Sequence, residues 1–144
     1  MASFGNLGLS AGRTERSART QRDATLAQNA YSRFLSQQRG QRDLQSLSER
    51  SNKDLGALSA AYSQRGLRNS GIQQQGRNEF ATQVSREQQG IQETANQGVM
   101  TADLSDQASM AAYEAAVQEA ELLKSADIAG LAQELMKYYP FLGS

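Results

Sequence analysis

A signal for one helix to stop and another to start lies near the middle of this chain, in residues 62–73. Gly66 suits the left-handed backbone conformation just past a helix end, where a residue with a Cβ is penalised. Ser70 follows at the spacing of an N-cap, since its hydroxyl can accept a hydrogen bond from the backbone N–H of Gln73. The signal predicts a helical hairpin, with a flexible joint in one longer rod as the alternative. The predicted turn residues are Gly66, Ser70 and Gly71.

On both sides of this turn, large apolar residues recur at steps of three, four or their sums, which is the periodicity of a helix. Polar Gln and Ser residues interrupt the series, so each arm has an apolar stripe no wider than a coiled-coil seam. No alternating run of β-branched residues indicates a strand. We therefore predict an all-α, elongated helical hairpin in an oligomeric bundle, because two isolated arms with so narrow a stripe are marginally stable. The predicted helix seam is Phe34, Leu44, Leu55, Leu58, Tyr62, Phe80, Val84 and Ile91.

The same signals divide the chain into five parts. We expect a flexible glycine-rich arm at 1–12 and a long basic helical arm at 13–65. The turn at 66–71 leads into an acidic helical arm at 72–124. An amphipathic docking segment at 125–144 completes the chain.

Charge is sorted along the sequence, although the 15 basic and 15 acidic side chains cancel. Residues 1–77 hold 12 basic and 5 acidic side chains, whereas residues 78–144 hold 3 and 10. The favoured interpretation is that the basic and acidic segments lie against each other, within one chain or between neighbouring copies. The alternative is that the basic half faces nucleic acid.

Four arginines recur every third residue at the start of the basic arm. An arginine can bind a carboxylate or a phosphate through two hydrogen bonds. In a hairpin folded about residue 68, this stripe would approach Glu114, Glu119 and Glu121, so ion pairing between helices explains it without DNA. Non-specific DNA contact remains an alternative, without aromatic interleaving to support base recognition. The arginines available for phosphate or carboxylate are Arg13, Arg16, Arg19 and Arg22.

Composition excludes most catalytic chemistry. The chain has no Cys and no His, so zinc sites built on those ligands and Ser/His or Cys/His catalysis are absent. Only 38% of residues are hydrophobic, too few for a thick globular core. Asp103 and Asp106 could share a helix face, but nothing predicts the pocket that a pair of catalytic carboxylates needs. We expect no enzymatic activity, no cofactor and no metal.

Five glycines interrupt the predicted arms, each at a cost of about 1 kcal/mol relative to Ala inside a helix. They either allow helices to approach closely or mark weak points that are partly disordered in the isolated chain. Both interpretations predict order that depends on assembly, whereas the Gln-rich composition also fits permanent disorder. These glycines are Gly40, Gly56, Gly76, Gly90 and Gly98.

The final segment is the most hydrophobic part of the chain. Ser125 is a plausible N-cap, and the stripe that follows ends before Pro140. A hairpin folded about residue 68 leaves this stripe without an internal partner, which predicts a docking site. Binding to a membrane surface is less favoured because such helices carry more Lys and Arg, and no membrane span or signal peptide is expected. The predicted docking residues are Ile128, Leu131, Leu135 and Tyr139.

Residues 58–71, which read Leu-Ser-Ala-Ala-Tyr-Ser-Gln-Arg-Gly-Leu-Arg-Asn-Ser-Gly, resemble an elbow in small helical virion proteins of tailed bacteriophages. In those proteins, which include tail, portal-vertex and internal ejection components, the elbow joins Gln-, Ala- and Arg-rich helices. The resemblance implies a structural role in a symmetric ring or bundle. It also implies contact with portal, tail or core proteins, and a location in the virion after assembly in the host cytoplasm.

Together, the residues and the resemblance predict a non-enzymatic structural component of a phage particle, forming a multi-copy helical assembly at the tail or portal vertex. One alternative is an internal virion protein that is ejected with the genome. Another is a helical protein that coats nucleic acid non-specifically, which requires affinity that falls steeply with salt.

Overall fold

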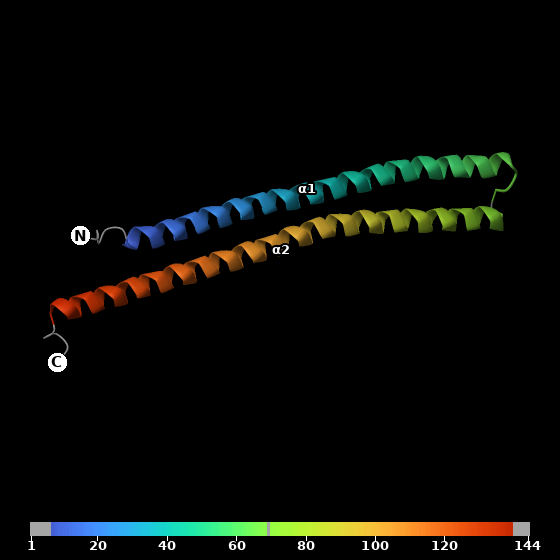
Figure 1. The fold of residues 1–144 in the computed structure, drawn as a ribbon. Coiled ribbons are helices and arrows are strands. Elements are labelled where there is room, and N and C mark those ends of the chain that lie inside the picture. The colour runs from blue at the N-terminus through green and yellow to red at the C-terminus, as the bar shows by residue number, and fades with distance from the viewer. Residues whose placement is uncertain (1–6, 69, 140–144) are drawn as a thin grey trace. The chain divides into compact units, whose positions relative to one another are not determined.

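Two long α-helices joined by a tight turn form the described part of the chain (Figure 1). In this computed structural model, residues 7–68 and 70–139 are described. Helix α1 spans Leu7–Gln64 and helix α2 spans Gly71–Tyr138. Within these residues there is no strand, so the predicted all-α class is confirmed.

The chain divides into two units. The turn unit comprises residues 30–103, where α1 folds back through the turn into α2 as an antiparallel hairpin. The terminal unit comprises the described residues of 1–29 and 104–144, where the first part of α1 lies beside the last part of α2 (Figure 1). In each unit, helices from the basic and acidic parts of the sequence therefore pack together.

The turn has the geometry of a Schellman ending followed by an N-cap. Gly66 has a φ of 69°, and its N–H donates to the Ser63 carbonyl at 3.2 Å. The N–H of Leu67 donates to the Tyr62 carbonyl at 3.0 Å, so two carbonyls at the end of α1 are satisfied. The Ser70 hydroxyl then accepts from the N–H of Gln73 at 3.2 Å, which satisfies a donor at the start of α2.

Both helices extend beyond the predicted boundaries. Helix α1 begins at Leu7, so the second half of the arm predicted at 1–12 is helical, whereas residues 1–6 lie outside the described residues. Helix α2 passes through Ser125 without a break, so Ser125 does not cap a separate helix. Its hydroxyl instead donates to the Glu121 carbonyl one turn earlier at 3.0 Å, as serines inside helices commonly do. The end of the predicted docking segment, residues 140–144, lies outside the described residues.

The packed faces of the turn unit follow an eleven-residue repeat. On α1, the buried and half-buried positions include Ser36, Leu47 and Leu58, and also Gly40, Ser51 and Tyr62. On α2 they include Gln73, Val84 and Ala95, and also Phe80, Ile91 and Ala102. Eleven residues in three turns is close to the natural period of an α-helix, which allows the two helices to run together with little supercoiling.

The terminal unit follows a seven-residue repeat instead. The shielded series on α1 is Ala11, Ala18 and Thr25, and the corresponding series on α2 is Asp106, Tyr113 and Ala120. A seven-residue repeat favours a left-handed supercoil. The change of repeat coincides with the division between the two units.

Candidate interaction surfaces

The helices of the turn unit approach each other closely at three glycines. A Cβ built on Gly40 would lie 2.9 Å from the Cβ of Ala95, and one built on Gly98 would lie 2.9 Å from the Cβ of Ser36. A Cβ on Gly76 would meet the ring of Tyr62, with the Cζ atom at 3.0 Å. These three glycines therefore permit close helix packing.

Gly56 and Gly90 differ from those three glycines. A Cβ on either would meet no atom within 4 Å, so neither is required by the packing of α1 on α2. Gly40, Gly76 and Gly98 fit close approach, whereas Gly56 and Gly90 only lower the helix propensity.

Two ion pairs link the basic and acidic segments across the turn unit. Arg33 Nε lies 2.7 Å from Asp103 Oδ1, and Arg50 Nη2 lies 2.6 Å from Glu87 Oε2. The arginines come from α1 and the carboxylates from α2, as expected if the oppositely charged segments lie against each other. All four side chains are partly exposed, so these pairs fix the register more than they add stability.

The terminal unit is joined by polar and aromatic contacts. Asn29 Nδ2 donates to Asp106 Oδ1 at 2.7 Å. The guanidinium of Arg22 lies over the ring of Tyr113, 4.1 Å from its centroid, which is a cation–π geometry. The hydrogen bond from Arg22 to Asp23 raises the pKa of this guanidinium above its ordinary value, so the side chain stays charged. These contacts were not foreseen from hydropathy.

The arginine stripe does not meet the predicted carboxylates. Arg19 pairs with Glu15 at 3.8 Å, and Arg22 pairs with Asp23 at 2.8 Å, both along α1 itself. The side chains of Arg13 and Arg16 are exposed and make no ion pair or hydrogen bond among the described residues. The predicted pairing with Glu114, Glu119 and Glu121 within one chain is therefore wrong. A stripe of arginines at every third residue turns around the helix, so only Arg22 reaches the face that packs on α2.

Most predicted seam residues border the contact between α1 and α2, but two do not. Leu44, Leu58, Tyr62, Phe80, Val84 and Ile91 are half-buried. Phe34 is 55% exposed and Leu55 is 38% exposed, so both lie outside the contact between α1 and α2 of one chain, and their place in a seam between copies stays a prediction. The buried series passes instead through Ser36 and Gly40, which a search for large apolar residues overlooks.

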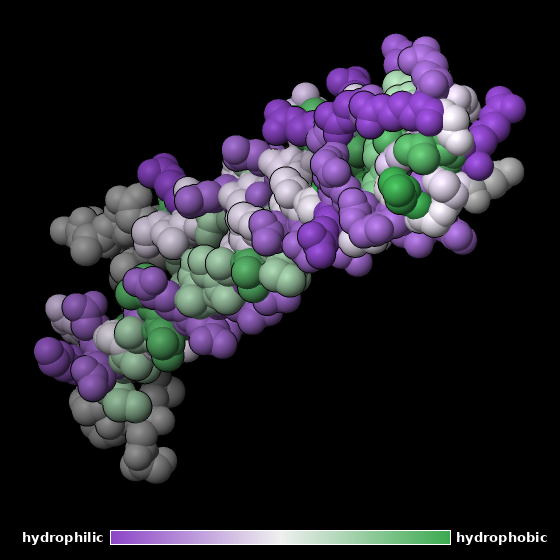
Figure 2. Space-filling view, turned by 90° about the vertical axis from the view of Figure 1, so that its right-hand side faces the viewer, coloured by the Kyte–Doolittle hydropathy of each residue, from purple (hydrophilic) through white to green (hydrophobic). Residues whose placement is uncertain are grey.

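The contact between the helices fully buries mainly alanines, while several large apolar side chains stay exposed. Among the described residues, the buried apolar side chains are Ala11, Leu47, Ala102 and Ala120. Exposed large side chains include Tyr31, Met100, Leu104 and Leu122. Figure 2 shows, on the face that it draws, apolar side chains in separate groups among hydrophilic ones.

Three of the predicted docking residues lie at the end of α2, and Tyr139 directly follows the helix. Ile128 is 66% exposed, Leu135 is 56% exposed and Tyr139 is also exposed, whereas Leu131 is half-buried. Met136 and Tyr138 are exposed beside them. This end of α2 thus presents apolar side chains on more than one side.

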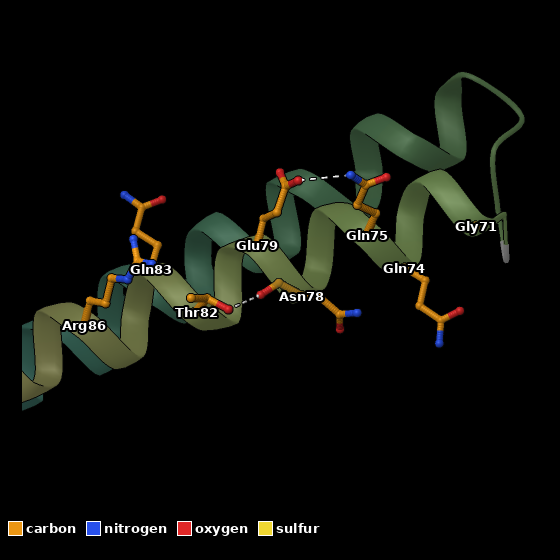
Figure 3. A pocket seen from close by; sticks show the side chains of 8 residues that line it. All are labelled: Gly71, Gln74, Gln75, Asn78, Glu79, Thr82, Gln83 and Arg86. Carbon is orange, nitrogen blue, oxygen red and sulfur yellow. Dashed lines mark hydrogen bonds between the residues drawn. The ribbon is translucent and has the colours of Figure 1, made fainter.

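A hollow beside the turn is lined only by α2, including Gln74, Asn78 and Arg86, and the side chains point outward in different directions (Figure 3). One side of a single helix is convex and cannot enclose a substrate. The described residues contain no group of three His, Cys, Asp or Glu side chains placed to hold a metal. None of the described helices is long and apolar enough to cross a membrane.

Comparisons with protein-family models, curated proteins and solved structures find no match for this chain.

Proposed function

We propose that this chain is a non-enzymatic structural component of a bacteriophage particle, where several copies form a helical assembly at the tail or portal vertex. The observation that carries the proposal is the placement of apolar residues. Apart from Leu47, the apolar residues that are fully buried between α1 and α2 are alanines, and glycines allow the close approach, whereas many leucine, isoleucine, methionine and tyrosine side chains are exposed. These exposed apolar side chains are thus available for contacts between chains.

The energetics favour association over an isolated pair of helices. Full burial of a Leu, Ile or Met side chain contributes roughly 1.5–3 kcal/mol. Within one chain, Leu47 is a large apolar residue that obtains this contribution, whereas Leu104, Leu122 and Ile128 do not. Packing these outer residues against other copies supplies the stability that the narrow contact between α1 and α2 lacks.

The assignment to a phage particle is supported by the resemblance of residues 58–71 to the elbow of tailed-phage virion proteins. The Schellman ending at Gly66 and the N-cap at Ser70 make this elbow a defined turn. A defined turn between long polar helices suits a part that is repeated around a symmetry axis. The chain would then contact portal, tail or core proteins through the end of α2, in the virion after assembly in the host cytoplasm.

Association is tested on the purified full-length chain by sedimentation velocity and circular dichroism across a wide concentration range. We expect a species of several copies, and a helix content that rises as the species forms. A compact monomer that melts cooperatively at high dilution contradicts the proposal. A DNA-binding titration is run in parallel, because affinity that falls steeply with salt would instead indicate a nucleic-acid-coating protein.

The location in a particle needs its own experiment. Phage particles from the lysate of cells that make this protein are purified, and gold-labelled antibodies to the chain are located by electron microscopy. We expect label at one vertex or along the tail. Label that appears only after particles are opened supports an internal ejected protein, and particles without any of the protein contradict a virion role.

A further inference from the structure

The terminal unit presents a basic face on α1. Leu9, Arg13 and Arg16 follow one another at steps of four and three, so they lie on one side of the helix. All three side chains are exposed. The residues that pack toward α2 are Ala11, Ala18 and their seven-residue series, so the basic face points in another direction.

The same unit presents an acidic face on α2. Met110, Glu114, Val117 and Glu121 follow at steps of four, three and four, and Ile128 continues the line two turns later. Met110, Ile128 and both glutamates are exposed, and Val117 is half-buried. This face has the spacing of a coiled-coil seam, but glutamates alternate with its apolar residues.

The charges on these two faces are unpaired within one chain. Among the described residues, Arg13, Arg16, Glu114 and Glu121 make no ion pair and no hydrogen bond through their side chains. Two positive charges on one helix thus correspond to two negative charges on the other, each beside exposed apolar side chains. Such faces are complementary in charge and both gain from apolar burial.

We propose that these faces are the two halves of an interface between copies, in which the basic face of α1 packs on the acidic face of α2 of the next copy. The inference rests on the proposed multi-copy assembly and identifies its surface. Because different faces meet, the contact is heterologous, and repeating it builds a ring or a filament.

A second copy fits these faces better than nucleic acid does. A phosphate backbone would neutralise Arg13 and Arg16 but would leave Glu114 and Glu121 unpaired. It would also leave Met110 and Ile128 exposed to solvent. A second copy pairs both sets of charges and covers the apolar residues as well.

The test exchanges charge on one face at a time in the full-length chain. One variant combines Arg13→Glu with Arg16→Glu, and the other combines Glu114→Arg with Glu121→Arg. In each variant alone, both faces carry the same sign, so we expect self-association to weaken by about tenfold or more. When the two variants are mixed, the altered α1 face of one variant meets the altered α2 face of the other with opposite sign, and the two unaltered faces also match, so we expect association to return.

A matched control keeps the change in net charge but moves it off the interface. Arg39 and Arg42 are exposed, lie three residues apart on α1 and belong to the turn unit. Combining Arg39→Glu with Arg42→Glu should leave self-association within about twofold of the unaltered chain, apart from the general effect of net charge.

Sedimentation equilibrium measures each association constant, and a double-stranded DNA oligonucleotide is titrated alongside. Weak association of both variants alone, restored on mixing, supports the interface. Unchanged association of either variant, or no recovery on mixing, overturns it while leaving the proposed assembly intact. The proposed interface is also overturned if the variant that combines Arg13→Glu with Arg16→Glu loses DNA binding but keeps its self-association. Failure of the unaltered chain to associate at all refutes the proposed assembly itself.

Discussion

A Cβ placed on Gly40 would lie 2.9 Å from the Cβ of Ala95, closer than two real Cβ atoms approach. Gly40 is buried on α1, and Ala95 is half-buried on α2. Neither position can give way by rotating a side chain, because a Cβ is fixed to its backbone. The spacing between the helices in the turn unit therefore depends on a residue without a side chain at position 40.

This dependence predicts opposite effects of the same substitution at two glycines of α1. Gly56→Ala should raise the melting temperature, because Ala favours the helix by about 1 kcal/mol and meets no atom within 4 Å. Gly40→Ala brings the same gain in helix propensity but should lower the melting temperature, because α1 and α2 must move apart to make room for the new methyl group. Thermal unfolding followed by circular dichroism at one fixed concentration measures both.

A double variant separates the clash from local effects on α1. Combining Gly40→Ala with Ala95→Gly moves the methyl group from one helix to the other, so we expect it to recover part of the stability lost by Gly40→Ala. A double-mutant cycle gives the coupling between the two positions. Equal stabilisation by Gly40→Ala and Gly56→Ala, or no coupling, would show that close approach does not govern the packing.

Some of this fold follows directly from local chemistry in the sequence. The two helices were predictable because Gly66 and Ser70 supply the ending of one and the cap of the next. The alignment follows from a short turn, since folding about residue 68 places Arg33 beside Asp103 and Arg50 beside Glu87. Short turns leave antiparallel helices little freedom to slide.

Hydropathy did not predict which face of each helix packs on the other helix. The face of α1 that packs on α2 in the turn unit contains Ser36 and Gly40, which carry no hydrophobic signal, while Phe34 points outward. Only an eleven-residue spacing, linking Ser36 with Leu47 and Leu58, would have revealed that face. The cation–π contact of Arg22 with Tyr113 escaped prediction because a carboxylate was the expected partner.

The turn predicts a large penalty for a branched side chain at Gly66. Its φ of 69° is unfavourable for residues with a Cβ and most of all for β-branched ones. Gly66→Val should destabilise the hairpin by about 2 kcal/mol or more and impair assembly, as measured by chemical unfolding and sedimentation. Gly66→Asn is the control, because Asn tolerates the left-handed region, and it should cost clearly less. Equal assembly of Gly66→Val and the unaltered chain would contradict a required turn.

The start of α2 predicts a smaller loss when the Ser70 hydroxyl is removed. That hydroxyl accepts from the N–H of Gln73 at 3.2 Å and donates to the Leu67 carbonyl at 2.8 Å. Ser70→Ala should lower the free energy of unfolding by about 1 kcal/mol. Ser70→Asp should lower it by much less, because Asp is also a good N-cap. Chemical unfolding measures both, and equal losses would show that the hydroxyl does not act as a cap.

The end of α2 predicts a loss of docking without a loss of helix. Combining Leu131→Ser with Leu135→Ser removes two large apolar side chains from the proposed docking residues. Leu135 is 56% exposed, so its replacement removes little packing within one chain, and the helix content of the long arms should stay the same. Incorporation into particles, measured by quantitative mass spectrometry, should fall by at least about tenfold, since burial of each Leu contributes roughly 1.5–3 kcal/mol and about 1.4 kcal/mol corresponds to tenfold. Met136→Ser is the control, because Met136 is equally exposed but lies on another side of α2, and it should be incorporated normally. Normal incorporation of the double variant would refute docking through Leu131 and Leu135.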